Sequence, residues 1–443
     1  MKIKFSINQY TKLRKNTSLE LIFNRVFGLF ISLMSVPILI RNCGTESYGI
    51  FILISSISFF LTISDFGIGN GIVNSLTQAI AKKDKTKINA LLSNVLVFSI
   101  FNALIVIILS YLLLNVLSLN LIFDLDLTTN LGNQFIKIAF LGASLALLGN
   151  ISQKLLLAKL RNKTYSRVQL FIVVATNIGL ILASRNSNPI AGMLLSSLVL
   201  PNVIGIGYLI IQIANDSTIK LSRQYLSISI IWQLMRNGRI YFYLQVAAIL
   251  NYQIDSILIS LFLDPSQVAE YSIVLKIASL PFILVSAVVF PIWAQTATFL
   301  ANREFQIAYK NLVHKLTKVM VFSFLSMIMF ITLGESFIHV WTGNQISPSR
   351  QLILANAIWI PISSLMQVYA MFLNGARENR FLFFTTGFFT VSNIIIAVYF
   401  LKFQGNISGP MWSNCLSGII FFVLPAYLLS KRFKTRIDDR AIG

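Results

Sequence analysis

The chain has 443 residues, of which 56% are hydrophobic and only 12% are charged, and its mean hydropathy is +0.76. This composition excludes a soluble globular protein, which would need far more polar surface at this length. The net charge of +21 would fit a nucleic-acid-binding protein. The positions of the basic residues along the chain show whether they form a nucleic-acid-binding surface.

Apolar segments of about 20 residues recur along the whole chain, and this is the length that crosses a bilayer as an α-helix. Backbone amides in lipid must be paired within their own segment, so these segments are predicted to be helical. The six spans predicted in the first half are residues 18–40, 48–72, 90–117, 135–158, 168–183 and 190–214. The six predicted in the second half are residues 240–263, 269–291, 319–339, 351–373, 381–401 and 411–429.

Lysine and arginine are distributed very unevenly over the two sides of these spans. The two termini and the loops on their side carry 28 of the 36 basic residues, the opposite face carries 5, counting Lys137 at the outer end of the fourth span, and the other 3 lie within spans. Such an excess is typical of the cytoplasmic side of a membrane protein. We therefore expect both termini in the cytoplasm. The basic charge indicates topology, and nucleic acid is excluded as a partner.

The longest charged interruption between spans divides the chain almost in half. The expected parts are an N-terminal six-helix half at residues 1–214 with a cytoplasmic tail at 1–17, a cytoplasmic linker at 215–239, and a C-terminal six-helix half at 240–443. A shift of 220 positions aligns the two halves weakly, with an acidic cytoplasmic turn at the same place in each. An even number of spans per half makes such repeats parallel, related by an axis along the membrane normal. The predicted fold is an all-α polytopic membrane protein with twelve transmembrane helices in two pseudo-symmetric six-helix bundles.

Polar side chains recur at helical spacing within several spans. In the first and second spans, the residues that share one helix face are Arg25, Gly28, Ser32 and Ser35, and Ser55, Ser58, Thr62, Asp65 and Gly69. Faces of this kind line a common cavity when several helices turn them inward. Small polar residues also let transmembrane helices pack closely, and this second explanation remains open for serine and glycine.

Ionised side chains within the spans are stronger indicators of function than serine or glycine. Placing Arg, Lys or Asp near a helix centre costs about 2.5–3.5 kcal/mol, so such residues face water or an opposite charge. We expect Asp65 to couple transport to an ion, because a carboxylate that faces a cavity can take up and release a proton. The residues expected to line a substrate-binding cavity are Arg25, Asn251, Asp255 and Lys276. The alternative is a structural ion pair, for instance between Arg25 and Asp65.

The remaining residues that could carry chemistry do not form a recognisable site. Lys137 and Lys154 lie near span ends and are expected to extend to the membrane interface. His314 and His339 have no metal-binding residues near them in the sequence, and no nucleotide-binding motif occurs, so no metal and no cofactor is expected. The outer loops are short, the longest being residues 118–134, which leaves no extracellular domain for catalysis. We therefore expect a transporter and not an enzyme.

Several short motifs resemble bacterial polysaccharide flippases of the Wzx type. Residues 37–41 (PILIR) and 44–49 (GTESYG) resemble the start of these proteins, and residues 65–69 (DFGIG) resemble their second span. Further matching positions are Asn74, Ala81, Gln253, Ile254, Asp255, Tyr271, Lys276, Asn374, Gly375 and Arg377. The resemblance covers most of the chain and departs from the usual pattern at Cys43 and Asp264.

This flippase family belongs to a superfamily (MOP) that also contains multidrug and cation antiporters (MATE) and the lipid II flippase. The resemblance implies that the protein flips an undecaprenyl-pyrophosphate-linked oligosaccharide across the bacterial cytoplasmic (inner) membrane, for O-antigen or capsule assembly. It implies membrane lipids and other polysaccharide assembly proteins as partners. Arg25 and Lys276 would then bind the pyrophosphate, and serine, asparagine and glutamine side chains would bind sugar hydroxyls.

Three other functions remain open at this point. An ion-coupled multidrug exporter of the same superfamily would favour an acidic or aromatic pocket, whereas here two cations accompany two acids. A membrane-embedded polysaccharide polymerase or acyltransferase would usually need a long outer loop or a histidine-containing motif, and the sequence has neither. A channel is less compatible with duplicated halves and with prolines that bend the spans, because both features suit alternating access.

Overall fold

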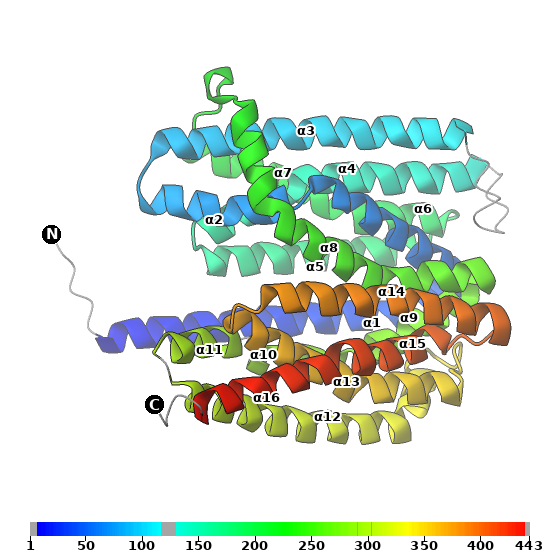
Figure 1. The fold of residues 1–443 in the computed structure, drawn as a ribbon. Coiled ribbons are helices and arrows are strands. Elements are labelled where there is room, and N and C mark those ends of the chain that lie inside the picture. The colour runs from blue at the N-terminus through cyan, green and yellow to red at the C-terminus, as the bar shows by residue number, and fades with distance from the viewer. Residues whose placement is uncertain (1–6, 117–129, 290, 303, 439–443) are drawn as a thin grey trace. The chain divides into compact units, whose positions relative to one another are not determined.

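The computed structural model describes residues 7–116, 130–289, 291–302 and 304–438, and every regular element in these ranges is helical (Figure 1). The chain forms two compact units, Met1–Ile249 and Leu250–Gly443. The boundary between the units lies inside one long helix, α8 (Ile228–Phe262).

The first unit contains the first six spans and the beginning of the seventh. Its other helices are α1 (Ile7–Leu61), α2 (Ile68–Ala81), α3 (Lys85–Val116), α4 (Asn130–Ala158), α5 (Asn162–Ala183), α6 (Pro189–Leu194) and α7 (Leu200–Ala214). Helix α1 contains two spans, because Gly44 has non-helical backbone angles (φ 81°, ψ 166°) and the chain turns back there. The sixth span consists of α6 and α7, joined by a π-helical turn at Leu195–Val199.

The second unit contains the rest of α8 and five further spans. Its other helices are α9 (Pro265–Ala278), α10 (Leu280–Val289), α11 (Pro291–Ala301), α12 (Phe305–Trp341), α13 (Arg350–Gly375), α14 (Asn379–Gln404), α15 (Gly409–Ser417) and α16 (Leu424–Asp438). Helices α9 to α11 form the eighth span. Helices α15 and α16 form the twelfth, joined by a π-helical turn at Gly418–Val423.

The described residues account for all twelve predicted spans. Ten helices are long and apolar enough to cross a membrane, and the bent pair Gln245–Asn251 and Gln253–Phe262, with an angle of 41° between its parts, forms one more. The candidate Phe23–Asp65 holds two spans, one on each side of Gly44. The prediction of an all-α membrane protein with two six-helix halves is confirmed.

The two units repeat the same local architecture. The last span of each unit is interrupted by a π-helical turn in its first half. In each unit the third span packs against the fourth, as α3 against α4 and as α12 against α13. The fourth span then packs against the last, as α4 against α7 and as α13 against α15. These shared irregularities support the internal duplication that the weak sequence repeat indicates.

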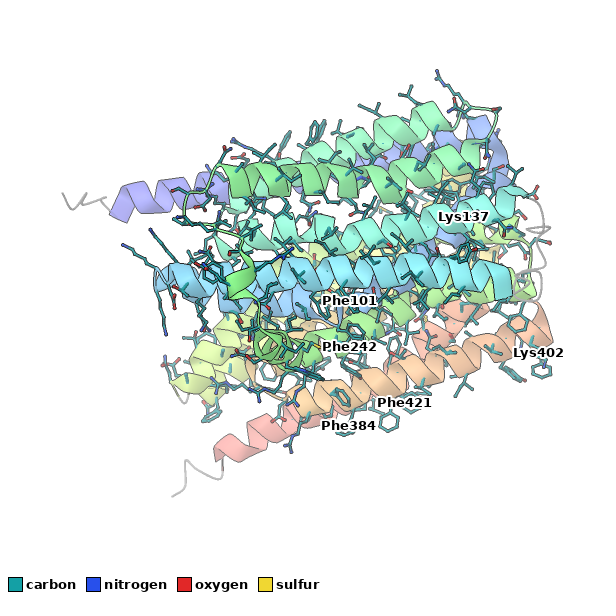
Figure 2. All side chains as sticks on the ribbon, turned by 90° about the horizontal axis from the view of Figure 1, so that it is seen from above. Phe101, Lys137, Phe242, Phe384, Lys402 and Phe421 are labelled. Atoms are coloured by element: carbon teal, nitrogen blue, oxygen red, sulfur yellow. The ribbon has the colours of Figure 1, made fainter. Side chains whose placement is uncertain are left out.

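Burial in the first unit fits a protein that lies in lipid. Ile72, Leu92 and Leu155 belong to a core cluster between α2, α3 and α4 and are at most 2% exposed. On α3, by contrast, the side chain of Phe101 points outward and is 60% exposed (Figure 2). Lipid tails are as apolar as phenylalanine, so this exposure has no cost in a bilayer, whereas similar patches in water promote association.

The segment between the sixth and seventh spans is bound along the first unit. Asn89 Oδ1 accepts a hydrogen bond of 2.9 Å from the backbone N–H of Lys220. Asn94 Nδ2 donates to the carbonyl of Tyr225 at 2.8 Å, and its Oδ1 accepts from the N–H of Ser227 at 2.9 Å. Two buried asparagines of α3 thus fix this segment to the unit that precedes it.

An ion pair holds the beginning of the same segment. Lys159 Nζ lies 2.7 Å from Asp216 Oδ2, and Thr218 donates two hydrogen bonds to Oδ1. Burial alone would raise the pKa of Asp216, but the hydrogen bonds from Lys159 and Thr218 lower it to about 2. The pKa of an unfolded aspartate is about 3.9. This pair therefore stabilises the fold above that pH, and the stabilisation is lost as the pH falls towards 2.

Helix α8 begins at Ile228, so the second half of the expected linker, residues 228–239, is helical. The reason is local: the segment ISIIWQLM at residues 228–235 is apolar and contains neither proline nor glycine. The charged residues on either side are the reason that this segment falls within the expected linker.

We expect Asn94→Ala to destabilise the protein by about 1–2 kcal/mol, because it removes the hydrogen bonds to the carbonyl of Tyr225 and the N–H of Ser227, which are both partly buried. Thermal unfolding of the purified protein in detergent measures this change. The matched control is Asn102→Ala on the same helix, since buried Asn102 donates within its own helix to the carbonyl of Phe98. Equal losses in the two variants would show that the bonds to the linker contribute nothing.

Candidate substrate and coupling site

The second span is broken at its centre. Helix α1 ends at Leu61, and Thr62–Asp65 form a 3-10 turn. Phe66 and Gly67 then adopt left-handed conformations with φ of 50° and 72°, and α2 begins at Ile68. A break of this kind leaves backbone groups unpaired inside the bilayer unless other residues satisfy them.

Asp65 and Gln245 supply the partners at this break. Asp65 Oδ1 accepts a hydrogen bond of 2.8 Å from the N–H of Gly67. Gln245, on α8, donates from Nε2 to the carbonyl of Thr62 at 3.1 Å. The carboxylate also lies at the N-terminal end of α2, where the helix dipole favours a negative charge. Asp65 is therefore held in place by the broken helix itself.

Glycines allow α8 to approach this break closely. A Cβ atom on Gly67 would lie 2.5 Å from the carbonyl oxygen of Gly238 and 2.6 Å from the nitrogen of Phe242. A Cβ atom on Gly238 would in turn lie 3.0 Å from the carbonyl carbon of Gly67. The rings of Phe66 and Phe242 stack beside the crossing, with centroids 5.7 Å apart. The break thus requires glycine for its backbone angles and for the helix contact.

Lys154 of α4 is the electrostatic partner of Asp65. A Cβ atom on Gly69 would lie 2.9 Å from Asp65 Oδ2 and 4.0 Å from Lys154 Cε, which places the two charged groups around the same glycine. Both side chains are partly buried. Lys154 is thus turned into the unit instead of extending to the membrane interface, as had been predicted from its position near a span end. Lys137, the other lysine with that prediction, is exposed near the beginning of α4 (Figure 2).

These two charges line a cavity of about 370 Å³ within the first unit. The other polar residues that line it are Ser58, Thr62, Ser99, Asn150, Gln153, Ser197, Asn202 and Gln245. Its ionised groups balance each other, and most of the remaining polar groups are amides and hydroxyls. Such groups form hydrogen bonds with a neutral polar ligand, for example the hydroxyls of a sugar. The second-span stripe of Ser58, Thr62, Asp65 and Gly69 therefore faces a cavity.

The first-span stripe has a different role within this unit. Ser35 Oγ donates to Asn177 Oδ1 of α5 at 2.7 Å, and Asn177 Nδ2 donates to Ser32 Oγ at 3.3 Å. A Cβ atom on Gly28 would touch Val173 of α5 at 3.6 Å. These three residues pack α1 against α5, which is the alternative that sequence reasoning left open for serine and glycine. Arg25, on the same helix, is exposed and does not line the cavity of the first unit.

Two of the predicted residues of the second unit, Asn251 and Asp255, make hydrogen bonds to other helices of that unit. Asp255 is 4% exposed, and its Oδ2 accepts hydrogen bonds from Tyr271 Oη at 2.6 Å and from Asn414 Nδ2 at 3.1 Å. One turn earlier, Asn251 Nδ2 donates to Thr390 Oγ1 at 2.9 Å. Within the described residues, Asp255 Oδ1 and Asn251 Oδ1 are buried and have no hydrogen-bond partner. Lys276 lies in the last turn of α9 and is only partly exposed.

A family model described as "Polysaccharide biosynthesis protein" matches residues 14–297, which is more than half of the chain. The chain belongs to the polysaccharide biosynthesis protein family. The match includes the broken second span, the cavity of the first unit, the whole of α8 and Lys276.

Relatives of this member of the polysaccharide biosynthesis protein family include two enterobacterial proteins. A Salmonella typhi protein assigned as an O-antigen transporter is 23% identical over 424 residues, which are 90% of this chain and 92% of the relative. A Yersinia pseudotuberculosis protein assigned as an O-antigen export protein is also 23% identical, over 79% of this chain and 80% of the relative.

Solved structures with the same fold come from two kinds of transporter. An inward-facing multidrug resistance MATE family transporter of the MOP superfamily has a TM-score of 0.73 and 13% identity, covering 92% of this chain and 96% of its own. The lipid II flippase MurJ in an inward closed conformation has a TM-score of 0.70 and 18% identity, covering 95% and 89%. At these identities the likeness shows the fold. The predicted resemblance to bacterial polysaccharide flippases is confirmed by the family match and the O-antigen relatives, and the predicted fold is the one that these solved transporters share.

Sequence reasoning missed Lys154 and Gln245 in this family member. One available signal was that Asn150 and Lys154 lie four residues apart, and so share a polar face of the fourth span. For Gln245 no such signal exists, because its partner Thr62 is 183 positions away.

Proposed function

We propose that this protein flips an undecaprenyl-pyrophosphate-linked oligosaccharide, such as an O-antigen or capsule repeat unit, from the cytoplasmic to the periplasmic leaflet by alternating access. The observation that carries the proposal is the cavity at the broken second span. It lies inside a membrane unit, is lined by amides and hydroxyls that suit sugar hydroxyls, and has a volume within the range of small-molecule sites. Family membership and the transporter relatives support the same assignment.

The proposed roles of the charged residues follow the chemistry of such a substrate. Arg25 and Lys276 bind the pyrophosphate, because a lipid-linked anion needs cations within the span region. Asn251 and Asp255, in the second unit, also bind the substrate. Asp65 couples transport to an ion gradient. As the cavity opens and closes, its negative charge is neutralised in turn by Lys154 and by a bound proton.

Complementation of a flippase-deficient bacterial strain tests the function, with surface polysaccharide as the readout. Restored polysaccharide supports the proposal. Expression in the bacterial inner membrane without restored polysaccharide, together with increased resistance to cationic drugs, would support the alternative of an ion-coupled multidrug exporter.

Arg25→Ala and Lys276→Ala should each lower surface polysaccharide at least tenfold in this strain at unchanged protein levels, because each removes a charge-assisted contact to the pyrophosphate. Lys276→Arg should keep partial function, since it retains the positive charge. Arg41→Ala is the control, because Arg41 is an exposed arginine at the other end of the first span. Full function of both alanine variants would remove Arg25 and Lys276 from the pyrophosphate site.

A further inference from the structure

The beginning of α8 has an orientation unlike that of its neighbours in the first unit. In Figure 1 its first turns cross α2 and α3 steeply. In Figure 2, turned by 90°, the same turns beside Phe242 are seen nearly end-on, while α3 is seen along its length. This part of α8 therefore runs across the direction of the spans.

Two arginines lie on this crossing helix. Arg236 and Arg239 are three residues apart, so their side chains leave the same face of the helix. Both are exposed, and neither takes part in an ion pair among the residues that the structure describes. Trp232, one turn before Arg236, is 65% exposed on the same face. Together these residues line an open groove of about 770 Å³.

The helix that carries the two arginines is held against the second span. Gly238 lies between them in the sequence and packs against Gly67 and Gly71, on either side of the start of α2. The two arginines are therefore fixed beside the broken span and do not lie on a free loop.

The two arginines and the tryptophan of this groove suit a diphosphate that carries an apolar chain. A guanidinium binds phosphate oxygens with two parallel hydrogen bonds, and two guanidiniums on one helix face can each bind one phosphate of a diphosphate. A tryptophan beside them offers an apolar surface for the first isoprenoid units, as aromatic rings do at membrane interfaces. The positive charge and the neighbouring apolar surface both match a polyprenyl diphosphate.

We propose that Arg236, Arg239 and Trp232 form a separate, initial binding site for the diphosphate headgroup of the polyprenyl-linked substrate on the cytoplasmic side of the first unit, occupied before the headgroup reaches Arg25 and Lys276. This inference rests on the proposed function. The site is separate from the polar cavity, whose lining residues include neither arginine.

The test measures binding of radiolabelled geranylgeranyl diphosphate in nanodiscs of phosphatidylcholine to the full-length protein carrying Arg25→Ala and Lys276→Ala, so that only the proposed initial site contributes. Arg236→Gln and Arg239→Gln should each weaken binding about tenfold, and the double variant about a hundredfold, because each removes one bidentate contact. Trp232→Ala should weaken binding a few fold. Geranylgeranyl monophosphate should bind more weakly than the diphosphate and depend less on the second arginine.

The control is the double variant Arg377→Gln, Arg380→Gln, which removes a second pair of exposed arginines with the same spacing. Its binding should equal that of the parent protein carrying only Arg25→Ala and Lys276→Ala. If the Arg236/Arg239 glutamine pair does not fold, the corresponding lysine pair is measured, and it should bind several fold more weakly because lysine is a point charge.

Three results would overturn the inference: undiminished affinity in the Arg236/Arg239 double variant, an equal loss in the control pair, or loss of all binding when the nanodiscs contain phosphatidylglycerol. The last result would assign the groove to bulk anionic lipid. The proposed function fails separately. A chain that binds the diphosphate through these arginines but does not restore surface polysaccharide keeps the site and loses the flippase assignment.

Discussion

Gly67→Ala should remove most of the folded protein from the membrane. An alanine at φ 72° is strained, and its Cβ would lie 2.5 Å from the carbonyl oxygen of Gly238, so α8 would have to move away from α2. Backbone strain costs about 1 kcal/mol and steric overlap about 2 kcal/mol, so the free energy of unfolding should fall by about 3 kcal/mol. Thermal unfolding in detergent and the amount of protein in the membrane measure the effect.

Gly405→Ala is the matched control for this substitution. Gly405 also has a positive φ of 59°, but a Cβ atom there would meet nothing within 4 Å. This variant has the backbone strain but no overlap, so its free energy of unfolding should fall by only about 1 kcal/mol. A loss at position 67 no greater than that at position 405 would mean that the crossing of α8 and α2 does not depend on close contact.

Asp65→Asn should abolish gradient-driven transport and leave substrate binding intact. The neutral amide can still accept the hydrogen bond from Gly67, but it can no longer carry an ionisable charge opposite Lys154. In vesicles with an imposed pH gradient, we expect transport by Asp65→Asn to fall at least tenfold, which corresponds to more than about 1.4 kcal/mol in the coupled step. Glu46→Gln, near the beginning of the same span, replaces an exposed acid and should have no effect.

A structural ion pair predicts a different outcome for the same variant. Removing one partner of a buried pair costs about 3–5 kcal/mol, so Asp65→Asn would then lower protein abundance. The swap of Asp65→Lys with Lys154→Asp would restore it. Gradient-driven transport at the wild-type rate in Asp65→Asn would end the coupling proposal.

The spans and their division into two halves could be predicted because both depend on local properties. A bilayer requires about 20 apolar residues per helix, and any such segment is visible in the sequence wherever it packs. The turn at Gly44 lies between two such segments, so the first two spans could be separated in the sequence although they form one continuous helix assignment, α1. The helical start of α8 was less visible, since its arginines resemble the charges of a loop.

The faces of the spans were harder to predict, because a helix can turn a polar stripe towards a cavity or towards another helix. The same pattern of small polar residues faces a cavity around Asp65 and packs against α5 around Ser35. Which of these occurs depends on the partner helix, and Asn177 of α5 is 142 positions from Ser35. The pairing of Asp65 with Lys154 could not be predicted for the same reason.

The dependence of the second span on α8 has a consequence for the order in which the protein is made. The carbonyl of Thr62 receives its hydrogen bond from Gln245, and Gly67 receives its packing partner from Gly238. Both partners leave the ribosome more than a hundred and fifty residues after the second span. Until then the break at Asp65 must be satisfied by water or by the insertion machinery. A nascent chain that ends with the sixth span, at Ala214, therefore holds six inserted helices and an unfinished fold.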